Sequence, residues 1–285
     1  MVRVVFLIIC VTISVSKPGF AEVIYSTDFD SLATGQTQSP ANPAQDGWRS
    51  DFHPGASFGE IQSAIANSGN AIRQFTDISN TIGQQSIDSR SLTSMPTAGI
   101  PKLVFQVDFY ASSSDLSRIN AYSAMADVTG VGGTVLEFSL NGGNGQAKST
   151  TGVSVGLAQF NGVDNNVPVP LVTGQGLAWD EWHTISVTAD LLADEWSEVT
   201  VNGVSQSLTG FVLPRTFGPS GAVRPTTLEE ISLQVINNDA FGDETSDSVY
   251  FDNLSLTAVP EPSGIGIGLL TASIVVSRRR RMPTE

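Results

Sequence analysis

The sequence predicts an all-β protein, organised as one antiparallel β-sandwich between an apolar segment at each end of the chain. Many of its segments alternate apolar and polar residues with a period of two, which is how a strand presents one face to a core. Clusters of glycine and asparagine, which favour turns, separate these segments. Long stretches with the period of an amphipathic helix are missing. The 285 residues therefore suit one large all-β domain.

The clearest predicted strand covers residues 103–110, where alternate apolar residues from Leu103 to Phe109 share one face. Further strands are predicted over residues 23–29, 71–75, 121–128, 134–140, 153–160, 183–189, 228–236 and 249–256. A hairpin is predicted at Asn202-Gly203, because this pair tolerates the positive φ angles of a type I′ turn. No repeat or long linker divides these segments, so residues 22–258 are expected to form one sandwich domain.

The charge of the body is strongly acidic. Between Glu22 and Pro260 there are 8 basic and 26 acidic residues, a net charge of −18. Such a body repels phosphate backbones and anionic lipids, so no nucleic-acid partner is expected. The chain has a single cysteine, Cys10, in a segment expected to be removed. The mature protein is therefore expected to have no disulfide and no thiol nucleophile.

The first 21 residues are predicted to be a signal peptide. Arg3 precedes an apolar run over residues 4–15, and the small residues Gly19 and Ala21 suit cleavage by signal peptidase before Glu22. The alternatives are a buried first strand or a membrane anchor. A run of 12 residues is about 18 Å long as a helix, too short for a hydrocarbon core of about 30 Å. Secretion is the prediction.

The other end of the chain, residues 259–285, combines a proline motif, a short membrane helix and a basic tail. Pro260, Glu261 and Pro262 precede an apolar run over residues 265–276. The tail carries Arg278, Arg279, Arg280 and Arg281. Because four arginines are hard to translocate, the tail is expected to stay in the cytoplasm and the body outside.

This three-part pattern resembles the PEP-CTERM sorting signal of bacterial surface proteins. The resemblance implies a bacterial source and processing by an exosortase, with the membrane helix as a transient anchor. It places the mature protein at the cell surface or outside the cell. An ordinary tail anchor is the alternative interpretation, since a single apolar segment with basic flanks looks similar.

Two features of the body resemble concanavalin A-like jelly rolls, including laminin-G-like domains. One is the strand that begins at Trp182, followed by a hairpin that ends at Asn202-Gly203. The other joins the two ends of the domain, residues 27–30 with 47–48 and residues 250–254. Carbohydrate-binding jelly rolls often open and close with adjacent terminal strands of this kind. The resemblance supports the sandwich and specifies no ligand.

A calcium site is a hypothesis for Asp252, which the alternation places on the same face as Tyr250 and Leu254. A buried carboxylate needs a partner, and Ca²⁺ with hard oxygen ligands is one. Asp28 and Asp30, on the neighbouring terminal strand, are the other candidate ligands. The alternative is that Asp252 accepts ordinary hydrogen bonds.

No catalytic residue is predicted. Residues 152–156 match G-x-S-x-G, but they continue as a strand instead of entering the helix that a nucleophile elbow needs. The paired carboxylates of glycosidases on this kind of sandwich are absent as a local motif, although distant strands could supply them. Trp179 is the candidate for stacking on a sugar. A non-catalytic structural or adhesive surface protein is therefore the expectation, with a carbohydrate-binding module as the alternative and a glycan-acting hydrolase third.

Overall fold

The structure is a computed structural model of the full chain. It describes residues 21–37, 45–52, 58–75, 85–112, 122–130, 133–141, 152–163, 167–218, 221–237 and 248–260. The predicted signal peptide up to residue 20 and the sorting signal from Glu261 onward lie outside the described residues. Within the described ranges, no helix combines the length and the apolar character needed to cross a membrane.

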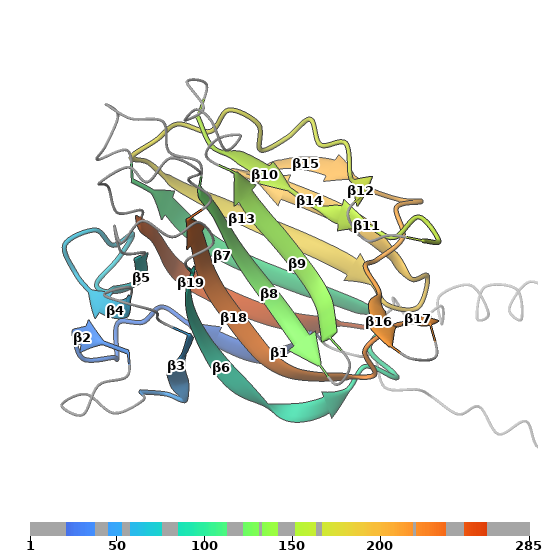
Figure 1. The fold of residues 1–285 in the computed structure, drawn as a ribbon, viewed down its shortest axis with the longest axis horizontal. Helices are drawn as coiled ribbons and strands as arrows, with labels where there is room; N and C mark the ends of the chain where they lie inside the picture. Colours follow the sequence, from blue (N-terminus) through green and yellow to red (C-terminus); the bar gives the residue numbers. More distant parts are fainter. Residues whose placement is uncertain are drawn as a thin grey trace, which may run out of the picture.

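The described strands form a sandwich of two antiparallel sheets, which confirms the predicted fold class (Figure 1). Across the nine-stranded sheet the order is β15 (Val204–Ser207), β14 (Glu195–Val201), β13 (Trp182–Asp190), β7 (Lys102–Ala111), β19 (Ser248–Val259), β5 (Ala71–Phe75), β4 (Phe58–Gln62) and β2 (Gly35–Gln36), with β1 (Glu22–Thr27) also paired to β19. Across the six-stranded sheet the order is β10 (Ser154–Gly156), β9 (Gly133–Asn141), β8 (Tyr122–Gly130), β18 (Thr227–Asn237), β6 (Gln85–Pro96) and β3 (Trp48–Phe52). Two small ribbons pair β11 (Ala158–Gln159) with β12 (Val167–Pro168) and β16 (Thr216–Gly218) with β17 (Gly221–Val223).

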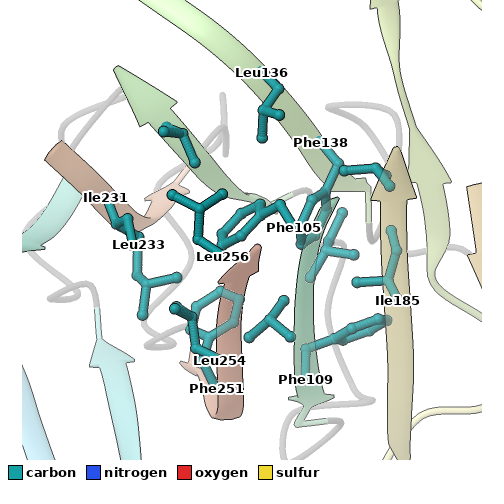
Figure 2. Packing of buried hydrophobic residues seen from close by; sticks show 14 of the residues in the cluster. Phe105, Phe109, Leu136, Phe138, Ile185, Ile231, Leu233, Phe251, Leu254 and Leu256 are labelled. Carbon is teal, nitrogen blue, oxygen red and sulfur yellow. The ribbon is translucent and has the colours of Figure 1, made fainter. Parts of the chain in front are cut away.

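The core lies between the two sheets, where the inward side chains of both meet (Figure 2). Phe105 of β7 and Phe138 of β9 come from opposite sheets, and their ring centroids lie 5.9 Å apart. Leu256 of β19 and Leu233 of β18 pack in the same cluster, and both are fully buried. The apolar residues of β7 therefore share one face, as the alternation predicted, and they fill the layer between the two sheets.

The observed strands agree with most of the predicted ones. The strand over 71–75 is found with those bounds, and the terminal strands β1 and β19 are adjacent. The hairpin at Asn202-Gly203 is confirmed, with φ angles of 48° and 79°. The long strand β6 was not predicted, because its many serines hide the alternation.

The predicted inward position of Asp252 is wrong. Tyr250 and Asp252 lie on the outer face of the nine-stranded sheet, while Phe251 and Leu254 lie in the core. The cause is a β-bulge after Asp252, where Asn253 has a φ of 46°. An extra residue in a strand reverses which side chains face inward beyond it.

A buried polar network lies at the edge of the core. The Asp88 carboxylate accepts hydrogen bonds from the Thr37 hydroxyl at 2.8 Å and from the Gln74 amide at 2.6 Å. The Ser86 hydroxyl donates to the Gln74 carbonyl oxygen at 2.8 Å. All four residues are at most 2% exposed. Such a network stabilises the fold only while every member is paired.

Gly59→Ala is expected to disturb this network. A Cβ atom at position 59 would lie 1.4 Å from an Asp88 carboxylate oxygen, so the carboxylate would have to move away from its donors. We expect a loss of about 1–3 kcal/mol in the free energy of unfolding, measured by urea titration. In a protein that already carries Asp88→Ala, Gly59→Ala should lower the free energy of unfolding clearly less than it does in the unchanged protein. If Gly59→Ala lowers the free energy of unfolding equally with and without Asp88→Ala, the contact between position 59 and the Asp88 carboxylate does not cause the loss.

Candidate functional site

A row of polar side chains crosses the outer face of the six-stranded sheet. Glu137 on β9 is directly opposite Asp127 on β8, which is opposite Ser232 on β18. Ser232 is opposite Ser89 on β6, and Ser89 is opposite Arg49 on β3. The three central residues are buried although they face away from the core, with exposed fractions of 8% for Asp127, 7% for Ser232 and 0% for Ser89.

A bulge in the β8–β9 hairpin brings the two carboxylates together. Thr129 pairs with Thr134, but the next pair is Val128 with Leu136, so Val135 is the extra residue. Without this shift Asp127 would be opposite Leu136. With it, Asp127 is opposite Glu137, and directly opposed residues in such a ladder have Cβ atoms about 4.5–5.5 Å apart.

Asp127 is the most perturbed acid of this row. Its pKa is raised from 3.8 to about 7, first by burial and then by the charge of Glu137, while a hydrogen bond from the Ser232 hydroxyl opposes the rise. Its Oδ1 atom is buried and has no hydrogen-bond partner within the described ranges. A buried carboxyl oxygen without a partner is costly, and perturbed acids of this kind are concentrated at functional sites.

Glu137 and Arg49 complete the electrostatics of the row. Burial raises the pKa of Glu137 as well. Arg49 forms an ion pair with Glu230 and a hydrogen bond with the Ser91 hydroxyl. Among the described residues, no arginine or lysine forms an ion pair with Asp127 or Glu137. The two carboxyl groups therefore hold one shared proton more readily than two negative charges near neutral pH.

Such a pair can perform acid–base chemistry. The protonated member can donate a proton to a leaving oxygen, while the ionised member can act as a base or a nucleophile. In retaining glycosidases the two carboxyl groups are about 5–5.5 Å apart, and in inverting ones about 6.5–9.5 Å apart. The Cβ atoms of directly opposed residues on adjacent antiparallel strands lie about 4.5–5.5 Å apart, so the opposition of Asp127 and Glu137 lets both carboxyl groups reach one glycosidic bond.

The three predicted calcium ligands do not form one cluster. Asp252 is fully buried, and its carboxylate accepts backbone N–H groups of Asn67 at 3.1 Å, Ser68 at 3.2 Å and Asn253 at 2.7 Å. The pKa of Asp252 is raised to about 6, chiefly by burial, while these hydrogen bonds oppose the rise.

Asp28 serves a local turn, and Asp30 contacts a segment distant in the sequence. The Asp28 carboxylate accepts the N–H of Asp30 at 3.1 Å, and that of Asp30 accepts the N–H of Asn70 at 2.7 Å. In the described part of the chain, no group of three or more acidic, histidine or cysteine side chains is arranged to hold a metal ion. Calcium binding by Asp252 stays a prediction.

Stacking of Trp179 on a sugar stays a prediction, and the structure also places the buried His183 nearby. Trp179 is half-buried and packs against the edge of the core. His183 is buried, with Nε2 at 2.8 Å from the Ala178 carbonyl oxygen and Nδ1 at 3.0 Å from the Asn202 amide nitrogen. Of the sorting residues only Pro260 lies within the described residues, at the end of β19, and cleavage at Ala21 is not tested by the structure.

Sequence reasoning missed Asp127 and Glu137. Both belong to predicted strands, and their alternation places each on a polar face. Glycine residues 130, 132 and 133 between the strands indicate a hairpin, but the bulge that sets the register leaves no clear mark in the sequence.

Comparison with known proteins adds to the fold. No protein-family model and no curated protein matches the sequence. Among solved structures, the alginate lyase Aly36B is similar with a TM-score of 0.52 and 14% identity, over 81% of this chain and 95% of that one. An endo-beta-1,4-glucuronan lyase from the fungus Trichoderma reesei has a TM-score of 0.52 and 8% identity, over 84% and 96%. An Aly36B mutant in complex with alginate trisaccharide has a TM-score of 0.50 and 12% identity, over 82% and 97%.

At these identities the likeness shows the fold, a jelly roll of the concanavalin A-like kind, as the sequence resemblance implied. The PEP-CTERM resemblance stays a prediction. The expectation of a non-catalytic protein is corrected, because the similar structures are polysaccharide-cleaving enzymes, one of them with a bound oligosaccharide. A sandwich can assemble catalytic acids from separate strands, so the lack of a local motif does not exclude an enzyme.

Proposed function

We propose that this protein is a glycan-acting hydrolase that cleaves a neutral polysaccharide on the outer face of its six-stranded sheet. Asp127 is the general acid, and Glu137 is the nucleophile or base. The observation that carries this proposal is the direct opposition of the two carboxyl groups, with the pKa of Asp127 raised to about 7. At neutral pH one member of the pair can be protonated while the other is ionised.

The charge of this face favours hydrolysis over the lyase reaction of the similar structures. Cleavage of a uronate chain by elimination develops negative charge beside a sugar carboxylate, and cationic or hydrogen-bonding groups must stabilise it. Among the described residues of this row, Arg49 is the one cation, and Glu230 already pairs with it. A body with a net charge of −18 also repels an anionic polymer.

The proposed location follows from the ends of the chain. A signal peptide before Glu22 would export the protein, and the PEP-CTERM-like segment would hold it in the membrane until processing. Signal peptidase and an exosortase are then its processing partners. Outside the cell, the protein would encounter extracellular polysaccharides as substrates.

The proposal is tested by the products released from a panel of polysaccharides. The purified protein is incubated with cellulose, xylan, starch and chitin, and separately with alginate and polyglucuronate. We expect new reducing ends from at least one neutral glycan, without the ultraviolet absorbance of unsaturated uronate ends. Unsaturated products from alginate would instead identify a lyase. If no glycan in the panel yields any product, the proposal that the protein is an enzyme is contradicted.

The hydrolysis should depend on pH in a defined direction. Asp127 must be protonated to donate a proton, so kcat/KM should fall as the pH rises through about 7. On the acid side, activity should fall as Glu137 takes up a proton and loses its role as a base. A profile that keeps rising well above pH 7 would show that Asp127 is not the acid.

A further inference from the structure

A row of aromatic side chains crosses the outer face of the nine-stranded sheet, on the side of the molecule opposite to the acidic pair. Trp182 on β13 is directly opposite Tyr110 on β7, which is opposite Tyr250 on β19. Tyr250 is opposite Arg73 on β5, and Arg73 is opposite Glu60 on β4. Because neighbouring strands lie about 4.8 Å apart, these five positions span about 19 Å, the reach of a short oligosaccharide.

The rings of this row contact one another without entering the core. The Tyr110 ring centroid lies 5.7 Å from that of Trp182 and 5.6 Å from that of Tyr250. The Arg73 guanidinium lies over the rings of Tyr250 at 5.8 Å and Phe75 at 4.7 Å. Trp182 and Tyr110 are half-buried and Tyr250 is only 7% exposed, so a ligand would reach mainly the first two rings, with Tyr250 supporting them from below. Their inward neighbours along the strands, not these rings, fill the core.

Polar groups border the row on one side and at one end. The segment over residues 63–70 lies beside it, because Asn67 binds both Asp252 and Asp108. Asp252 follows Tyr250 by two positions and Asp108 precedes Tyr110 by two, so this opposed pair is the next one on the same face. At the Trp182 end, the Tyr110 hydroxyl donates a hydrogen bond of 3.2 Å to the carboxylate of Asp180. The row is therefore a strip of rings with hydrogen-bonding edges.

The charges of the row are compensated. Arg73 and Glu60 form an ion pair of 3.0 Å. With the body at a net charge of −18, an anionic polymer gains little here. A neutral pyranose chain matches this surface, because its C–H faces are apolar and its edges carry hydroxyl groups, as the strip requires.

We propose that this row, made of Trp182, Tyr110, Tyr250 and Arg73, is a second glycan-binding surface that holds a neutral polysaccharide away from the hydrolytic pair. Its role would be to keep the protein on an insoluble polymer while the other face acts. The binding role stands on the row itself and does not require that Asp127 and Glu137 be catalytic.

The proposal is tested by co-sedimentation of the purified protein with insoluble cellulose, chitin and starch granules. We expect the protein to bind at least one of these polymers. Trp182→Ala should raise the dissociation constant about tenfold or more, since the largest aromatic contact of the row is lost. Tyr110→Leu, which keeps apolar volume beside Trp182 but removes a flat ring, should act in the same direction. Thr188→Ala, on the same face of β13 but outside the row, should bind as the unchanged protein does.

Asp127→Asn separates this inference from the proposed hydrolysis. It should abolish cleavage and leave co-sedimentation unchanged, because it lies on the other sheet. The inference is overturned if the unchanged protein binds none of the three polymers, or if both Trp182→Ala and Tyr110→Leu bind normally. It is also overturned if Trp179→Ala weakens binding while Trp182→Ala, with an unchanged melting temperature, does not.

Discussion

Replacing Asp127 with asparagine is expected to lower kcat/KM about 10²–10⁴-fold and at the same time to stabilise the folded protein near pH 8. Asparagine keeps the shape of the side chain but cannot donate the proton that the leaving oxygen needs. Its amide also removes a buried charge that faces Glu137. A residue that serves the fold alone would lower stability when changed, so the two effects together identify a catalytic acid.

The stability gain has a definite pH window. The folded state holds the Asp127 proton up to a pKa of about 7, whereas the unfolded state releases it near 3.8. Between these values the folded state binds more protons, so the free energy of unfolding falls as the pH rises through the window. The fall amounts to the order of a few kcal/mol, and Asp127→Asn should abolish most of it.

Urea titrations from about pH 4 to pH 8 measure this effect on the unchanged protein and on Asp127→Asn. Glu198→Gln is the matched control, because this exposed acid on β14 should alter neither turnover nor the pH slope. Unchanged turnover in Asp127→Asn would remove the residue from the mechanism. Two parallel stability curves would show that Asp127 is already ionised in the folded state at acidic pH.

Phe105→Ala is expected to cost about 3–5 kcal/mol in the free energy of unfolding. Phe105 is fully buried at the centre of the layer between the sheets, and its ring meets Phe138 of the other sheet at 5.9 Å (Figure 2). Neither sheet can move toward the other without losing its remaining contacts, so the cavity is expected to persist.

The neighbouring residue provides the control. Gln106 lies next to Phe105 on β7 but faces outward and is half-buried, so Gln106→Ala should change the free energy of unfolding by only about 0.5 kcal/mol. Chemical denaturation of the two variants side by side measures the difference. Similar losses in both would mean that β7 does not join the two sheets as described.

The sequence by itself determined the fold class and much of the strand pattern. Alternation over residues 103–110 is strong because one face of β7 meets the core and the other does not. The turn at Asn202-Gly203 is local chemistry, since positive φ angles are required there and few residue pairs adopt them. These features depend on neighbours in the chain, so they can be predicted from the chain alone.

The tertiary structure alone decided which polar side chains meet. Val135 in one bulge shifts the register so that Asp127 is opposite Glu137, and the bulge at Asn253 turns Asp252 to the outer face. A shift of one residue exchanges the two faces of a strand, and the packing of whole sheets, not the local sequence, selects it. The pKa of Asp127 depends on burial beside Glu137 and Ser232, from two other strands, so the acid could not be recognised before the strands were paired.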